Sequence, residues 1–252
     1  MRVLVTNDDG IDSEGLISLK RAIAAVGDVV VIAPDHNWSA AGHTKTMHKP
    51  LRVTKVTLPD GDHGFACDGT PSDCVALSML GLAGERPSLV VSGINKGVNL
   101  GGDITYSGTV AAAMESVVNG VPAIAVSVPA FREWRFEAAA EFAAKLSRLL
   151  LSTGFPPDAL LNVNVPALPA DEIQGVEITR LGKRIYRDRL IERQDPFGRS
   201  YYWIGGDEPT GNAEEGTDIW ALANNRISVT PIHMDLTNHP LIEQLKGWKL
   251  AL

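Results

Sequence analysis

Residues 1–34, MRVLVTNDDGIDSEGLISLKRAIAAVGDVVVIAP, read as a strand, a helix and a second strand in close succession. The apolar residues 3–5 precede the polar turn 7–10, and apolar side chains then recur at helical spacing. A second apolar run, residues 29–33, ends at a proline. Two strands joined by a helix over about thirty residues pair in parallel through a right-handed crossover. This stretch therefore predicts the first unit of a parallel sheet.

The same alternation returns further along the chain. Residues 89–91, 123–126 and 161–165 read as buried strands, the last of which closes the core. Residues 109–119 and 134–152 read as helices, the second of them long and amphipathic. Continuous apolar strands are buried on both faces, as in doubly wound sheets. We therefore expect an α/β fold with a Rossmann-like, doubly wound and mostly parallel sheet.

The start of a further helix is marked by Thr70-Pro71-Ser72-Asp73. Threonine suits the N-cap, proline suits the first helical position, and an acidic residue suits the third. This pattern predicts a helix that runs from there to about Leu82.

The chain changes character after Pro166. Residues 180–199 hold seven basic and three acidic residues, and Tyr201-Tyr202-Trp203 and many glycines follow. Such alternation favours extended hairpins that stand off the core, with an aromatic face open to solvent or covered by a partner subunit. We expect one domain over residues 1–252, with an α/β core that carries the active site at 1–166 and a hairpin-rich oligomerisation extension at 167–252.

Composition excludes several classes of protein. The net charge of −7 provides no global positive field, which argues against a general binder of nucleic acids or anionic membranes. No run approaches the ~18 apolar residues of a membrane span, and an aspartate pair precedes any apolar signal-peptide core. We expect a soluble, cytoplasmic protein whose two cysteines, Cys67 and Cys74, are reduced and buried.

Three unusually polar loops follow predicted strands. They are residues 7–10 (NDDG), 37–42 (NWSAAG) and 92–99 (SGINKGVN). In open α/β sheets, ligands bind outside the carboxyl ends of the strands, so these loops are candidates for one shared site.

The adjacent carboxylates Asp8 and Asp9 can converge where a strand breaks into a loop. Two converging carboxylates repel unless one is protonated or a cation lies between them, and oxygen-only surroundings select Mg²⁺ or Mn²⁺. Ser39 and Asn95 are candidate neutral oxygen ligands. Each motif also has a plainer interpretation: Asp-Asp-Gly as an ordinary turn, Ser39 as the cap of a turn, and Asn95 as a left-handed loop residue.

Ser107, Gly108 and Thr109 lie where the helix predicted over residues 109–119 begins. A helix N-terminus with hydroxyl groups and a glycine is a natural seat for phosphate. Capping of the helix by Ser107 would account for a hydroxyl group at this position, but not for the glycine-rich segment, residues 97–102, that leads to it. The loop lacks the Gly-Lys-Ser/Thr ending of a P-loop, and no G-x-G-x-x-G follows the first strand.

The six histidines are scattered without metal-ligand spacing, so each is read as a surface or packed residue. His43 is close enough to Ser39 in sequence to be a candidate that lines the site. Asn7, Gly42 and Lys96 are candidates of the same kind because they adjoin the expected ligands.

Taken in order, VTNDDG at 5–10, NWSAAG at 37–42, CDGTPSDCV at 67–75 and SGINKGVNLGGDITYSGTVAAAME at 92–115 resemble the survival protein E (SurE) family. The resemblance covers most of the first ~165 residues. It implies a Rossmann-like core with one divalent metal per subunit, held at the positions of Asp8, Asp9, Ser39 and Asn95. It also implies hydrolysis of 5′- and 3′-nucleoside monophosphates and, in some members, of short-chain polyphosphate.

The resemblance also implies a homodimer or homotetramer in which C-terminal arms exchange between subunits. The match is looser over residues 183–203, where family members vary.

The mechanism that these residues favour is metal-assisted hydrolysis of a phosphomonoester. Asp8 and Asp9 would hold the cation, whose chemistry would be to polarise a phosphoryl oxygen and to lower the pKa of a bound water. Asn95 and residues 107–109 hold the other phosphate oxygens, so the expected catalytic residues are Asp8, Asp9 and Asn95. Asp8 as the base or the nucleophile remains an alternative. Two alternative classes are a non-catalytic binder of phosphorylated ligands, and a phosphatase with an aspartyl-phosphate intermediate. The second usually needs two aspartates separated by one residue, whereas Asp8 and Asp9 are contiguous.

Overall fold

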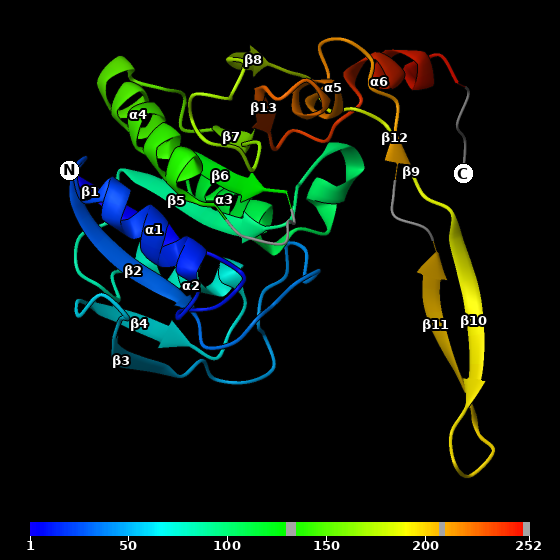
Figure 1. Ribbon diagram of the computed structural model, residues 1–252, viewed down its shortest axis with the longest axis horizontal. Coiled ribbons are helices and arrows are strands. Elements are labelled where there is room, and N and C mark those ends of the chain that lie inside the picture. Colours follow the sequence, from blue (N-terminus) through cyan, green and yellow to red (C-terminus); the bar gives the residue numbers. More distant parts are fainter. Residues whose placement is uncertain (130–134, 207–209, 249–252) are drawn as a thin grey trace.

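The computed structural model describes residues 1–129, 135–206 and 210–248. Within these residues, nine strands form one sheet of order β3-β4-β2-β1-β5-β6-β7-β13-β8 (Figure 1). In chain order, the strands of this sheet are β1 (Arg2–Thr6), β2 (Asp28–Pro34), β3 (Val53–Thr57), β4 (His63–Cys67), β5 (Leu89–Lys96), β6 (Ala123–Val128), β7 (Ala159–Asn164), β8 (Val176–Ile178) and β13 (Ile227–His233). The helices against it are α1 (Glu14–Ile23), α2 (Pro71–Met79), α3 (Gly108–Val118) and α4 (Glu137–Thr153).

The opening strand–helix–strand unit forms as the sequence predicts. β1 pairs in parallel with β2 on one side and with β5 on the other, so β1 is an interior strand of the sheet. The side chain of Ser13 caps α1 by accepting a hydrogen bond from the backbone N–H of Leu16. The predicted α/β class with a mostly parallel, doubly wound sheet is confirmed.

Helices cover both faces of this sheet and close two apolar cores. α1 and α4 pack on one face over Val3, Val5 and their neighbours, and α2 and α3 pack on the other over Leu4 and its neighbours. The second core includes Cys67 and Cys74, which are buried free thiols, as predicted. Alanines in the first turns of α3 have no bulky side chain, so this helix packs closely against the sheet.

The start of α2 confirms the capping pattern read from residues 70–73. The Thr70 side chain accepts from the backbone N–H of Asp73, and the Asp73 carboxylate accepts from the backbone N–H of Thr70. The helix ends at Met79, short of the expected Leu82, because the chain turns through Gly81 at a φ of +92°.

Two expectations about the extent of the sheet were wrong. Residues 161–165 do not close it, because β13 pairs antiparallel with β7 and β8 pairs in parallel with β13. β5 also continues past residue 91 to Lys96, with a shift in its pairing to β6 between Ser92 and Asn95. Strands β3 and β4, which lie beyond β2, were not anticipated.

The other predicted elements match within a few residues. α3 spans Gly108–Val118 where a helix over residues 109–119 was expected, and α4 begins at Glu137. Residue 134, the first of the helix predicted over 134–152, lies outside the described residues. Among the described parts of the chain, no helix is long and apolar enough to cross a membrane.

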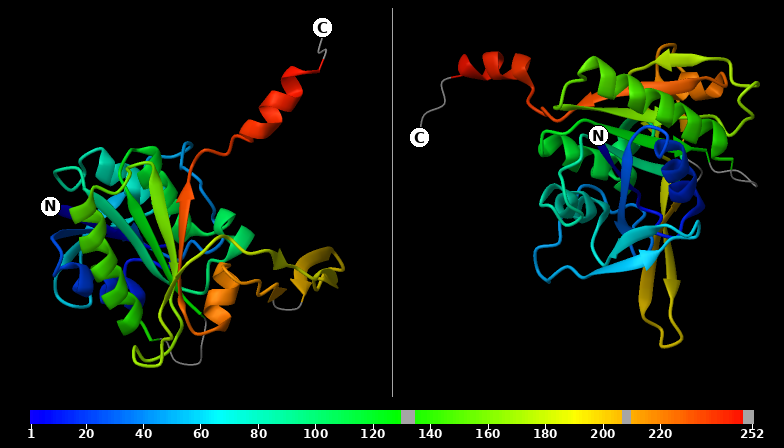
Figure 2. Two further views of the ribbon diagram at one scale, coloured as in Figure 1. Left: turned by 90° about the horizontal axis from the view of Figure 1, so that it is seen from above. Right: turned by 90° about the vertical axis from the view of Figure 1, so that its left-hand side faces the viewer.

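The C-terminal part of the chain contains the extended hairpin that its composition predicts. β10 (Asp188–Gln194) and β11 (Ser200–Gly206) pair antiparallel and project from the body of the molecule, with Tyr201, Tyr202 and Trp203 exposed (Figure 1). α6 (His239–Lys246) also reaches away from the core and has no buried residue (Figure 2). The remaining short elements near the base of the hairpin are η1 (Gly101–Thr105), β9 (Arg184–Ile185), β12 (Thr210–Gly211) and α5 (Asp218–Ala223).

Gly15 shows how closely α1 approaches the sheet, and it provides a test of the packing. A β-carbon at this position would overlap the backbone carbonyl oxygen of Ile94 in β5. We expect Gly15→Ala to lower the free energy of unfolding by about 1–3 kcal/mol, because the helix must shift away from the strand. Urea denaturation measures this change. Ser18→Ala, in the same helix, is the control, and its free energy of unfolding should stay within ~0.5 kcal/mol of the wild-type value. Equal stability of the two variants would contradict the packing described here.

Candidate active site

Asp8 and Asp9 lie in the turn that follows β1, at the carboxyl end of the central strand. Asp8 is buried, with 4% of its surface exposed, and Asp9 is half-buried. Asn7 stabilises the turn: its side-chain amide donates to the carbonyl oxygen of Gly10 at 3.0 Å and to the hydroxyl of Ser13 at 2.7 Å. The structure therefore gives Asn7 a part in shaping the turn, through contacts that tie it to the start of α1.

The loop after β2 is bonded directly to this turn. The backbone N–H of Trp38 donates to the carbonyl oxygen of Asp8 at 2.8 Å, and the Asn37 amide donates to Oδ1 of Asp9 at 3.4 Å. The backbone N–H of Ser39 donates to the Asn37 side chain at 2.7 Å, and Ser39 itself is exposed. Asn37 therefore links Ser39 to Asp9. Sequence reasoning missed this role, although Asn37 is the first residue of the polar loop.

The end of β5 is the third segment of the candidate site, after the turn that follows β1 and the loop that follows β2. The backbone N–H of Lys96 donates to Oδ2 of Asp9 at 3.3 Å, which brings the end of β5, with the half-buried Asn95, to Asp9. The Asn95 amide nitrogen donates to the carbonyl oxygen of Gly97 at 2.8 Å. This bond fixes the Asn95 side chain through its nitrogen. Lys96 extends its ammonium group to 3.5 Å from the Glu14 carboxylate.

The N-terminus of α3 abuts Asp8. The Thr109 hydroxyl donates to Oδ1 of Asp8, and a β-carbon on Gly108 would lie 2.7 Å from the β-carbon of Asp8. Ser107 caps the helix, since its hydroxyl accepts from the backbone N–H of Val110 at 3.1 Å. The capping role that the sequence left open for Ser107 is therefore present, and glycine at position 108 is what allows the helix to come this close.

The two remaining candidates are Gly42 and His43. Gly42 contacts the segment just before α3, and His43 contacts α3 itself. The Gly42 N–H donates to the carbonyl oxygen of Tyr106 at 3.0 Å. Nε2 of His43 lies 3.0 Å from the carboxylate of Glu115, which also accepts from Lys45 at 2.7 Å. Glu115 is 1% exposed and anchors the segment that carries Ser39. A glutamate inside the alanine-rich sequence of α3 was the signal that could have revealed this anchor.

Burial raises the pKa of Asp8 to about 6, from an ordinary value of 3.8. The hydrogen bond from Thr109 opposes this shift, and the neighbouring charge of Asp9 adds to it. Burial also raises the pKa of Asp9, against the influence of the backbone N–H and the charge of Lys96. Both shifts indicate that the pair is short of positive charge.

A hard divalent cation fits this set of donors. Two carboxylates lie next to each other with their negative charge poorly compensated, and the other candidate ligands, Ser39 and Asn95, offer neutral oxygens. Within the described residues, no group of three or more His, Cys, Asp or Glu side chains could hold a metal ion. The candidate donors are two carboxylates, a hydroxyl and an amide oxygen, a set that suits Mg²⁺ or Mn²⁺.

Comparison with known proteins places the chain in a family. A model described as "Survival protein SurE" matches residues 3–188. The chain belongs to the SurE family. Proteins named 5′-nucleotidase SurE from Chloroflexus aggregans and Herpetosiphon aurantiacus are 52% and 50% identical to it, with 99% and 97% of each chain covered in both directions. The crystal structure of the SurE protein from Aquifex aeolicus is 44% identical, covers 98% of both chains and has a TM-score of 0.85.

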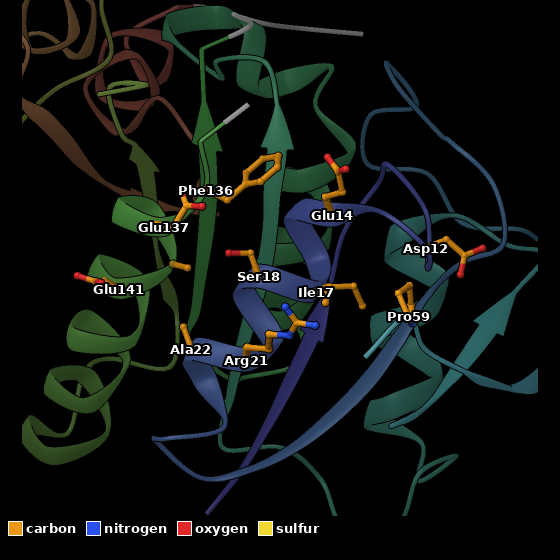
Figure 3. Close-up of a pocket in the computed structure, with 11 residues that line it drawn as sticks. Asp12, Glu14, Ile17, Ser18, Arg21, Ala22, Pro59, Phe136, Glu137 and Glu141 are labelled. Carbon is orange, nitrogen blue, oxygen red and sulfur yellow. The ribbon is translucent and has the colours of Figure 1, made fainter. Parts of the chain in front are cut away.

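Cavities near the candidate site of this SurE-family chain differ in their relation to the carboxylate pair. A cavity of about 350 Å³ is lined by Asp9, Asn37 and Lys96, among others, and so opens directly beside the pair. A larger one, of about 770 Å³, lies between α1 and α4, and Figure 3 shows Ser18 and Arg21 on α1 and Glu137 and Glu141 on α4. The smaller cavity is the better candidate for substrate, since it adjoins the groups that can do chemistry.

The raised pKa of Asp8 predicts how the metal-free protein responds to pH. Because the folded-state pKa of about 6 exceeds the ordinary 3.8, the folded protein binds this proton more tightly than the unfolded chain does. This contribution makes the free energy of unfolding in EDTA rise as pH falls from about 7 through 6 toward 4. Asp8→Asn removes the buried charge, so at a pH of about 7.5 it should be more stable than the wild type, by up to about 3 kcal/mol.

Urea denaturation with EDTA and with Mn²⁺ measures both effects. Manganese should stabilise the wild type and should have little effect on Asp8→Asn, because binding to the folded state alone raises stability. The exposed Asp158→Asn is the matched control and should follow the wild type. An Asp8→Asn protein that is less stable than the wild type in EDTA would refute this account of the charge.

Proposed function

We propose that this SurE-family protein is a 5′-nucleotidase that hydrolyses the phosphomonoester of nucleoside monophosphates with the help of a divalent cation. The observation that carries the proposal is the contact between a buried carboxylate, Asp8, and the N-terminus of α3 at Gly108 and Thr109. An acidic pair suited to a cation and a helix terminus suited to an anion lie together there. A phosphate ester bridging a cation and a helix N-terminus is the ligand that this combination favours.

The cation would be held by Asp8, Asp9, Ser39 and Asn95, one cation in each subunit. When bound, it would supply Lewis-acid stabilisation of the charge on the phosphoryl oxygens. The chain's own contribution is to orient these ligands: Thr109 fixes Asp8 through its hydroxyl, and Asn37 with the Lys96 N–H fixes Asp9. Held in this way, the carboxylates need little reorganisation as charge moves in the reaction.

Backbone N–H groups at the start of α3 and the side chain of Asn95 would bind the remaining phosphate oxygens. The first N–H groups of a helix have no partner inside the helix, and the helix dipole favours negative charge there. Charge in phosphoryl transfer spreads over these oxygens, so positioned donors stabilise the transition state without a covalent intermediate. The same contacts would accept 3′-monophosphates and short polyphosphate, which present the same phosphoryl group.

Assembly into a homodimer or homotetramer is a further part of this proposal. The exposed aromatic residues of the β10–β11 hairpin and the exposed apolar side chains Leu241 and Ile242 of α6 support it. These groups project away from the core, where a second subunit would cover them.

Hydrolysis and its metal dependence test the function directly. Wild-type protein incubated with AMP and Mn²⁺ should release free phosphate, and EDTA should abolish the release. Asp8→Asn and Asp9→Asn should each lower kcat by at least ~10²-fold, because each removes a ligand of the cation. Asp158→Asn, an exposed aspartate outside the site, is the control.

Circular dichroism shows whether each variant keeps its fold. Undiminished turnover in either folded variant would remove Asp8 or Asp9 from the mechanism. Thermal stabilisation by AMP with no phosphate release would instead identify a protein that binds nucleotides without hydrolysing them.

A further inference from the structure

The cavity of about 350 Å³ beside Asp9 extends away from the carboxylate pair toward the loop that follows β2. Its lining includes Asp9 and Lys96, and also Asp35 and His36 from the loop that follows β2. Its volume lies within the range of small-molecule sites in proteins. A ligand with its phosphate at the carboxylate pair therefore has room for the rest of its structure in this cavity.

His36 presents an aromatic ring to this space. Its side chain is 58% exposed, and Nδ1 lies 2.5 Å from the carboxylate of Asp35, which limits rotation of the ring. The ring of Trp38 lies beside it: the centroids of the His36 and Trp38 rings are 5.0 Å apart, and the two ring planes meet at 35°. The backbone N–H of Trp38 is in turn bonded to the carbonyl oxygen of Asp8 at 2.8 Å. The imidazole is therefore held at a fixed place relative to the catalytic turn.

We propose that this cavity is the nucleobase subsite of the enzyme and that the base stacks on the ring of His36. The inference rests on the proposed nucleotidase function and extends it to the part of the substrate that does not react. Aromatic side chains, including histidine, commonly bind bases by stacking, and such contacts tolerate different bases because each has a π-face. The carboxylates of Asp12 and Asp35 in the same wall can accept hydrogen bonds from exocyclic amino groups.

Two other cavities fit this role less well. The cavity between α1 and α4 shares only Asp12 with the wall described here and is not lined by Asp9, the member of the carboxylate pair that lines the smaller cavity (Figure 3). A third cavity, of about 730 Å³, is lined by His43, Met114 and the residues at the end of β13. It borders α3 past its first turn and also lacks Asp8 and Asp9. Met114 therefore provides a variant that tests this competing location.

The test compares two substrates that share a phosphoryl group but differ in the base. For each protein, kcat/KM is measured for AMP and for ribose 5-phosphate, and the ratio of the two values isolates the contribution of the base. We expect His36→Ala to lower this ratio about tenfold, mainly through KM for AMP, because base stacking on an aromatic side chain is lost. His36→Phe should restore most of the ratio. His63→Ala, which removes an exposed histidine on β4, should leave it at the wild-type value.

The possible outcomes separate this inference from the function on which it rests. An unchanged ratio in a folded His36→Ala protein overturns the subsite, and so does a fall that occurs in Met114→Ala and not in His36→Ala. If the wild type hydrolyses neither substrate, the proposed nucleotidase function fails, and the inference fails with it. Hydrolysis of both substrates with a loss of ratio confined to His36→Ala supports the subsite.

Discussion

Two neighbouring carboxylates, Asp8 and Asp9, are confined at the end of the central strand, where burial raises the pKa of both. A folded protein tolerates such a charge only when other groups compensate for it. Here the compensation is partial: it comes from the Thr109 hydroxyl, the Asn37 amide and the backbone N–H of Lys96. The site therefore remains short of positive charge, and this deficit is what suits it to a cation and an anionic ester together.

The fold brings these groups together through contacts of the backbone. β1 lies between β2 and β5, so the loops that follow all three strands open at the same edge of the sheet. Gly108 lets α3 approach Asp8, and Gly15 lets α1 approach the carbonyl oxygen of Ile94, one residue before Asn95. Side chains at these glycine positions would push the helices away from the loops. The positions of the candidate ligands therefore depend on the close packing of the helices, which these glycines allow.

Local signals in the sequence were sufficient for the first unit of the sheet and for the start of α2. Apolar spacing and the Thr70–Asp73 capping box are properties of neighbouring residues, and both are present in the structure. Strands β8 and β13 were missed because their pairing depends on residues distant in the sequence, whereas β3 and β4 pair with each other as a local hairpin that the sequence reading did not assign. The three loops were predicted to meet, and they do. The links through Asn37 and Glu115 were missed for the same reason as β8 and β13, since each bond spans many residues.

The position of β13 has a consequence for how the chain is made. β13 covers the edge of β7, yet it lies more than sixty residues later in the chain. During synthesis from the N-terminus, β7 therefore has an open hydrogen-bonding edge until residue 233 has left the ribosome. Open strand edges are prone to pair with other chains, and incompletely folded chains that expose them are prone to aggregate. A stalled or truncated product that ends in the β10–β11 hairpin would carry all the metal-ligand candidates but would be a substrate for chaperones or proteases.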